Sequence, residues 1–135
     1  MALIQKPRSL AFVLCDQVLF DHDSRKPMLV GIFSEIRVDR FPCFPPRFDA
    51  FAALTDGLGR GTISLLVMQV STDEEMSVQS AEIEFTDPLV SVNLRFRFRQ
   101  LSFPDPGAYI FSLLADDEEV AQYRVEISQA EETYS

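Results

Sequence analysis

Short apolar runs, separated at short intervals by clusters of turn-forming residues, are the feature that most constrains how this chain can fold. The clusters combine Pro, Gly, Asp and Ser, which favour the backbone angles of tight turns. They include Asp21–Ser24, Asp56–Gly57, Asp73–Glu75, Pro104–Gly107 and Asp116–Glu119. The runs between them are rich in Val, Ile, Leu and Phe. Many short strands parted by turns predict an antiparallel sandwich or barrel.

About eight runs qualify as strands and predict an all-β fold, a two-sheet antiparallel β-sandwich of the immunoglobulin-like or jelly-roll-like type. The predicted strands are Leu10–Phe20, Met28–Val38, Phe48–Thr55, Thr62–Val70, Ser77–Phe85, Leu89–Arg99, Ala108–Leu114 and Val120–Ser128. Within Arg47–Thr55 the apolar residues also fit helical spacing, so a short helix is the alternative there.

The alternation of apolar and polar residues indicates which face of each predicted strand is buried. In Ala81–Phe85 and Tyr123–Ile127 the odd positions are apolar and the even ones polar, so each strand has one core face. Leu10–Leu14 and Ile63–Val70 are apolar on both faces, which requires additional cover. The segment Arg40–Arg47, called the Phe-Pro loop below, holds three prolines and two Phe. We expect it to fold irregularly over one edge or end of the sandwich and to supply that cover.

The length suits a single domain, predicted over residues 1–128, followed by an acidic tail at residues 129–135 that is expected to fray. No apolar run approaches the roughly 18 residues of a membrane span, so no membrane association is expected. The N-terminus lacks the order of charged and apolar regions that marks an export signal, which favours a cytoplasmic protein. In that compartment Cys15 and Cys43 are expected to be free, buried thiols.

The charge balance and the rarity of His narrow the possible functions. The chain has 21 acidic and 12 basic residues, a formal net charge of −9, which argues against general nucleic-acid binding. One His and two Cys leave little material for a metal centre or His-based catalysis, so we expect no cofactor and no enzyme.

Asp21-His22-Asp23 is interpreted as a turn. Asp56–Thr62 is interpreted as a hairpin turn, because a strand follows it where a phosphate-binding loop needs a helix.

Two stretches of the sequence carry a resemblance to a known family. The first comprises Cys15–Asp21, Leu29–Phe33, the Phe-Pro loop and Asp49–Thr55, and the second is Phe103–Leu113. Together they resemble a small bacterial family known as a domain of unknown function. The resemblance implies a β-sandwich and a bacterial cytoplasmic protein, and it brings no catalytic or ligand-binding residue with it.

The second stretch can also be interpreted from its residues. Pro106-Gly107 forms a turn pair, and Tyr109, Phe111 and Leu113 then share one strand face. A tyrosine directly after such a turn can bury its ring while its hydroxyl reaches a backbone group, as in the corners of β-sandwiches. The predicted role of Tyr109 is therefore architectural.

The most distinctive local pattern is the alternation of arginine and apolar residues in Asn93–Arg99. On a strand, Arg95, Arg97 and Arg99 form a row on the outer face, with neighbours about 6.6 Å apart. Guanidinium groups so placed repel each other unless anions lie between them. Cross-strand pairs with Glu82 and Glu84 of the preceding strand would supply those anions internally. The alternative is a docking face for an acidic partner, a phosphate or a nucleic-acid backbone.

A second candidate surface consists of four phenylalanines in and after the Phe-Pro loop: Phe41, Phe44, Phe48 and Phe51. They are expected either to form a satellite core or to line an apolar pocket.

Two functions remain open. The leading hypothesis is a non-enzymatic interaction module that binds a protein partner or self-associates as a homo-oligomer. The alternative is a small-molecule binding protein or enzyme that uses the pocket under the Phe-Pro loop.

Overall fold

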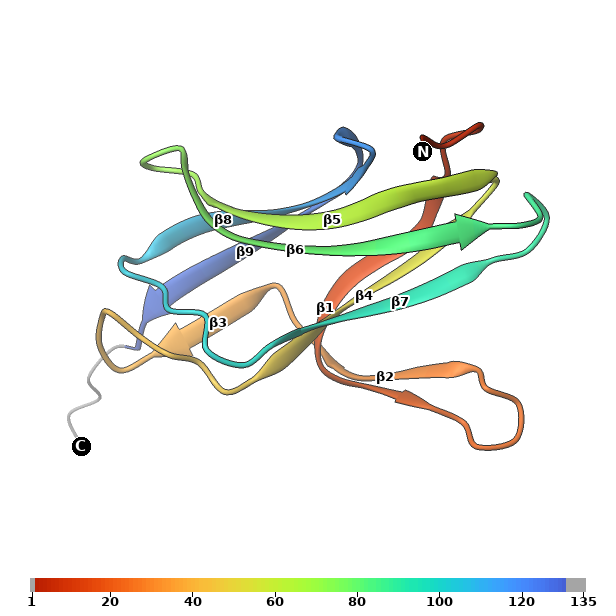
Figure 1. The fold of residues 1–135 in the computed structure, drawn as a ribbon. Coiled ribbons are helices and arrows are strands. Elements are labelled where there is room, and N and C mark those ends of the chain that lie inside the picture. Colours follow the sequence, from red (N-terminus) through yellow and green to blue (C-terminus); the bar gives the residue numbers. More distant parts are fainter. Residues whose placement is uncertain (1, 131–135) are drawn as a thin grey trace.

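Nine strands in two packed sheets make up the fold of residues 2–130, which a computed structural model describes (Figure 1). The strands are β1 (Arg8–Phe20), β2 (Pro27–Ile32), β3 (Glu35–Val38), β4 (Phe48–Thr55), β5 (Gly59–Gln69), β6 (Glu74–Phe85), β7 (Val92–Phe98), β8 (Gly107–Ala115) and β9 (Glu118–Gln129). The predicted all-β sandwich is confirmed, and Phe48–Thr55 is a strand rather than a helix. No helix of the described residues could cross a membrane.

The four-stranded sheet has the order β2-β1-β4-β7, and the five-stranded sheet has the order β3-β9-β8-β5-β6. All neighbours pair antiparallel except β3 and β9, which run parallel. The runs β1-β4-β7 and β9-β8-β5 match the A-B-E and G-F-C orders of an immunoglobulin-like sandwich. The Tyr109 hydroxyl donates a 2.6 Å hydrogen bond to the Asp105 carbonyl, which confirms the predicted tyrosine corner. Strand β2 has no counterpart in the immunoglobulin-like strand order. It is an additional strand at one edge of the four-stranded sheet.

The main core lies between the two sheets and follows the alternation of the strands. Phe96 and Phe98 on β7 face Phe111 and its neighbours on β8, and all of them are buried. The Phe98 and Phe111 rings meet edge to face with their centroids 5.5 Å apart. Apolar residues at alternate strand positions therefore form this core as the sequence predicts.

One predicted strand, Met28–Val38, is two strands that belong to different sheets. Strand β2 pairs with β1, whereas β3 pairs with β9 on the opposite side of the core. Near the end of β2 the backbone takes a φ of 69° at Gly31, which favours glycine, and a Cβ at this position would collide with the Asp16 carboxylate. Both halves alternate like strands, so the pattern alone does not show the break.

The outer face of β4 is covered by the β1–β2 hairpin rather than by the Phe-Pro loop. Val18 packs with Phe51 and Ala53 of β4 in a second apolar cluster, to which Phe20 and Leu29 add their side chains. This hairpin cluster explains why every residue of β4 is buried. The Phe-Pro loop instead lies at one end of the sandwich, where the backbones of Cys43 and Phe103 exchange two hydrogen bonds.

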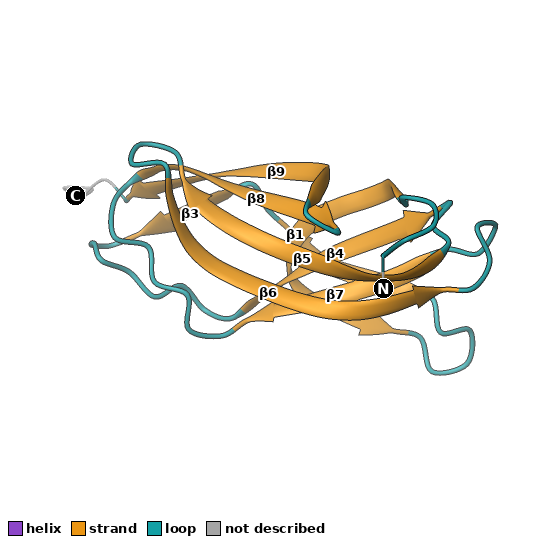
Figure 2. Cartoon of the chain, turned by 45° about the horizontal axis from the view of Figure 1, so that its top comes forward, coloured by secondary structure: helices purple, strands orange, loops and turns teal. Residues whose placement is uncertain are grey.

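The segment Asp56–Thr62 does not form the predicted hairpin turn. Residues 56–58 connect β4 of one sheet to β5 of the other, the remaining residues begin β5, and Leu58 forms a bridge with Gln5 of the N-terminal segment. The two ends of the described chain lie at opposite ends of the elongated sandwich (Figure 2). Gln129 of the predicted tail belongs to β9, and residues 131–135 lie outside the described residues.

Candidate functional site

Strand β7 carries the predicted arginine row at the free edge of the four-stranded sheet. Its apolar residues Phe96 and Phe98 are buried in the main core, whereas Arg95 and Arg97 are exposed on the opposite face. Arg99 follows directly after the strand and is also exposed. The alternation of the sequence therefore gives the correct face for all three arginines.

The glutamates that could have neutralised this row are in the other sheet. Glu82 and Glu84 lie on β6, which pairs with β5, and the Glu84 carboxylate is 3.8 Å from Arg60. The predicted cross-strand ladder is therefore wrong, because consecutive strands β6 and β7 belong to different sheets. Among residues 2–130, none of the ion pairs includes a member of the row.

Arg95 differs from the other two because the hairpin holds it. Its guanidinium carbon lies 5.7 Å from the centre of the Phe20 ring, a cation–π distance, and Nη1 donates a 3.4 Å hydrogen bond to the Val18 carbonyl. These contacts close one side of the hairpin cluster. Arg95 is thus partly a structural residue, which leaves Arg97 and Arg99 as the members available to a ligand.

Arg97 and Arg99 line a cleft of about 180 Å³ together with Arg47, which ends the Phe-Pro loop. Phe48 and Phe98 also line the cleft, and their rings stack in the main core with centroids 5.0 Å apart. The remaining lining residues are Asp16, Gln17, Val30 and Asp49. Sequence reasoning missed Arg47, although its position directly before a buried strand places it at the rim of the sheet. The cleft brings two predicted arginines and one further arginine together.

Asp49 is the buried charge of this cleft, with 7% of its surface exposed. Its Oδ2 accepts a 2.9 Å hydrogen bond from the Val18 backbone N–H, so the carboxylate anchors the hairpin to β4. Arg97 is its partner across the strand pair. With Asp16 at the rim, the cleft holds three positive and two negative groups. The balance is positive in a chain whose net charge is −9.

The four predicted phenylalanines do not come together. Phe48 is buried in the main core and Phe51 in the hairpin cluster, on opposite faces of β4. Phe41 is half-buried against the main core, and Phe44 is 70% exposed. Residues 48 and 51 differ by an odd number, and alternation therefore places them on opposite faces of a strand.

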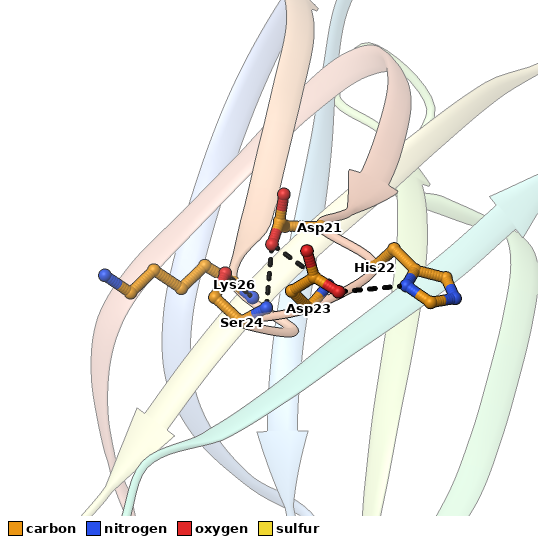
Figure 3. Close-up of polar contacts among 5 residues, drawn as sticks. All are labelled: Asp21, His22, Asp23, Ser24 and Lys26. Carbon is orange, nitrogen blue, oxygen red and sulfur yellow. Dashed lines mark hydrogen bonds and ion pairs between the residues drawn. The ribbon is translucent and has the colours of Figure 1, made fainter.

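The tip of the hairpin contains the Asp21-His22-Asp23 sequence (Figure 3). The Asp21 carboxylate accepts hydrogen bonds from the Ser24 and Asp23 backbone N–H groups, at 2.7 and 3.2 Å. The hydrogen bond from the Ser24 backbone is the largest cause that lowers the pKa of Asp21. His22 Nδ1 lies 3.2 Å from Asp23 at the surface. The described contacts are those of a turn, and no metal-binding group of His, Cys, Asp or Glu occurs in residues 2–130.

The two cysteines are free and buried, as the sequence predicts. Cys15 lies in the hairpin cluster and Cys43 in the main core, so they belong to different clusters. Burial is the main cause that raises the pKa of both thiols above the ordinary value. A raised pKa disfavours the thiolate, which is the nucleophilic form.

The chain belongs to the DUF6941 family, a family of unknown function whose model matches residues 10–128. No curated protein sequence matches the chain. Among solved structures, the alkylpurine DNA glycosylase AlkC from Pseudomonas fluorescens, bound to DNA containing an abasic site analog, is 9% identical with a TM-score of 0.50. That match covers 87% of this chain and 30% of the glycosylase chain, and it shows the fold alone.

Two further structures have lower TM-scores. An immunoglobulin-like protein from Pseudomonas aeruginosa is 10% identical with a TM-score of 0.45, covering 90% of this chain and 96% of the other. A β-glucosidase from Listeria innocua is 10% identical with a TM-score of 0.49, covering 93% of this chain and 16% of the enzyme. The chain thus spans less than a third of the glycosylase and of the glucosidase.

Proposed function

We propose that this protein is a non-enzymatic interaction module of the bacterial cytoplasm that binds an acidic segment of a partner protein. The partner segment would lie along the arginine cleft, defined as Arg47, Arg97, Arg99 and the residues that line the cleft with them. The observation that supports this proposal is that three exposed guanidinium groups converge on one cleft without an ion-pair partner among the described residues.

Arginine suits this role because its planar guanidinium offers several N–H donors that match a carboxylate in a bidentate geometry. The attraction between opposite charges is strongest where water is partly displaced, as it would be under a bound peptide segment. Asp16 and Asp49 disfavour a dense polyanion, since nucleic-acid backbones would meet both carboxylates. An acidic peptide can place its charges at the arginines alone.

The small-molecule alternative has less support. It depends on a pocket lined jointly by the four phenylalanines, and these residues point into two cores and into solvent. The arginine cleft itself, at about 180 Å³, is smaller than the roughly 300–1,000 Å³ of a typical ligand pocket.

The test removes the three charges of the cleft and leaves Arg95 intact, because Arg95 supports the hairpin. The variant Arg47→Ser/Arg97→Ser/Arg99→Ser is compared with Arg8→Ser/Arg60→Ser/Arg124→Ser, which removes the same charge from exposed positions elsewhere. Each protein is titrated with a hexaglutamate peptide and used as bait in a bacterial lysate.

We expect the peptide to bind the wild type and the control, and the cleft variant to bind at least about tenfold more weakly, a difference of ~1.4 kcal/mol. Raising the salt concentration weakens the binding, because exposed charges are screened. Equal binding by the cleft variant and the control, or retention of every partner from the lysate, would contradict the proposal.

A further inference from the structure

Strand β2 forms an open edge of the four-stranded sheet. It pairs with β1 on one side, and in residues 2–130 no strand pairs with its other side. Alternate peptide groups of an edge strand point away from the sheet and offer hydrogen bonds to another strand. This edge belongs to the hairpin that lies outside the immunoglobulin-like strand order.

The four edges of the sandwich are not equally protected. Natural sheets block unwanted pairing with charged side chains on their edge strands. Strand β7 carries Arg95 and Arg97, β6 carries four glutamates, and β3 carries Glu35 and Arg37. Strand β2, with the sequence Pro-Met-Leu-Val-Gly-Ile, carries no charge. Apart from Pro27 at its start, no residue of β2 belongs to the types that block pairing with another strand.

The solvent side of this strand is apolar. Met28, Val30 and Ile32 alternate along it with exposed fractions of 47%, 47% and 59%. Leu19 of β1 is the cross-strand partner of Met28 and adds to the same face. The other face of the hairpin, with Val18 and Leu29, covers the hairpin cluster. The exposed side chains are therefore additional to those that the fold itself needs.

The charge distribution identifies the partner that fits this edge. Asp21 and Asp23 at the tip are balanced by Arg25 and Lys26, so the segment from Val18 to Ile32 is neutral. The net charge of −9 thus lies elsewhere on the chain. Two copies repel each other over most of their surfaces, and they meet along β2 without opposing like charges. A neutral apolar strand is complementary to a second copy of itself.

We propose that two copies of this chain associate by antiparallel pairing of their β2 strands about a two-fold axis. The two four-stranded sheets then form one continuous sheet of eight strands. Such an interface is isologous, because each copy contributes the same surface and the assembly closes as a dimer. The inference goes beyond the proposed function and rests on the β2 edge and not on the arginines, although Val30 of β2 also lines the arginine cleft.

The length of the strand sets the strength of this dimer. A contact over the six residues of β2, about 20 Å of strand, buries less area than the roughly 800 Å² per partner of a standard stable interface. We therefore expect a dissociation constant in the micromolar range. At cellular concentration such a dimer would exchange with the monomer.

Analytical ultracentrifugation over a wide concentration range tests the inference. The wild type should pass from monomer to dimer as its concentration rises. Ile32→Lys, which places a charge on the β2 edge, should remain monomeric at every concentration. Val78→Lys is the matched control, since Val78 is 50% exposed on the other sheet. It should dimerise like the wild type.

A wild type that stays monomeric at millimolar concentration would overturn the inference, as would a dimer that Val78→Lys disrupts and Ile32→Lys does not. Hydrogen exchange of the wild type gives a readout that does not depend on the folding of a variant. The β2 amides should become protected as the concentration rises, and unchanged protection in a dimeric sample would also overturn it. The cleft variant should still dimerise, which separates this test from that of the proposed function.

Discussion

The molecule contains two apolar clusters that differ in how they are closed. The main core is enclosed by two sheets and contains Phe111 and Tyr109, both fully buried. The hairpin cluster is enclosed on one side by β4 and on the other by two strands that fold back over it. The first depends on many strands and the second on one hairpin. This difference predicts that the hairpin can open while the sandwich stays folded.

Phe111→Ala should have the largest effect on stability. The Phe111 ring contacts Phe48 and Phe98 edge to face and has no exposed surface. Its removal leaves a cavity that packed sheets cannot close, with an expected cost of about 3–5 kcal/mol. Urea unfolding followed by circular dichroism measures this cost. A loss below ~1 kcal/mol would show that the main core adapts as readily as the hairpin cluster.

Phe51→Ala should cost less, about 2 kcal/mol, because the hairpin can move into part of the space that the ring leaves. Its effect should also be local. Hydrogen exchange should accelerate in β1 and β2 beyond Cys15 and change little in β5 and β8. Equal acceleration in both sheets would show that the two clusters unfold as one unit.

Asp49→Ala should cost about 1–3 kcal/mol, because it leaves the buried Val18 N–H without its acceptor. Asp49→Asn keeps an acceptor oxygen at the same place and is the control that should retain most of the stability. Thermal unfolding compares the two variants. If they lose equal stability, the charge of Asp49 matters more than its hydrogen bond to the hairpin.

Lowering the pH should loosen the hairpin tip. This is the smallest of the predicted effects. The Ser24 hydrogen bond lowers the pKa of Asp21 below its ordinary value of 3.8 in the folded chain. The stabilisation is therefore complete above that ordinary value and is lost as the pH falls through the lowered pKa. The Ser24 amide resonance, followed by NMR during acidification, reports this loss. In Asp21→Asn the same titration step should disappear.

Much of this architecture follows from the alternation of side chains. It assigns Arg97 to the surface and Phe98 to the core, and together with the Pro106-Gly107 turn it predicts the tyrosine corner at Tyr109. The pairing of strands does not follow from it, because a strand has the same alternation whichever neighbour it meets. For this reason the sequence pattern pairs Glu82 with the wrong strand and gives Met28–Val38 as one element.

The full set of arginines in the cleft also cannot be predicted from alternation alone. Arg97 and Arg99 follow from one strand, whereas Arg47 joins them because β4 is paired with β7. The predicted grouping of the four phenylalanines is wrong for a related reason. Phe48 and Phe51 are close in sequence, but the pleat of the strand separates them into two clusters. Only the fold brings distant residues to one place.

The parallel pairing of β3 with β9 has a consequence for synthesis of the chain. Glu35 aligns with Glu126, and the Tyr123 hydroxyl donates its hydrogen bond to the Phe33 carbonyl. A ribosome adds roughly 5–20 residues per second, so β3 waits on the order of ten seconds for its partner to emerge. The nascent N-terminal third cannot complete its own sheet during that time. Its uncharged β2 strand is exposed throughout, which makes this interval the period when chaperone protection matters most for the protein.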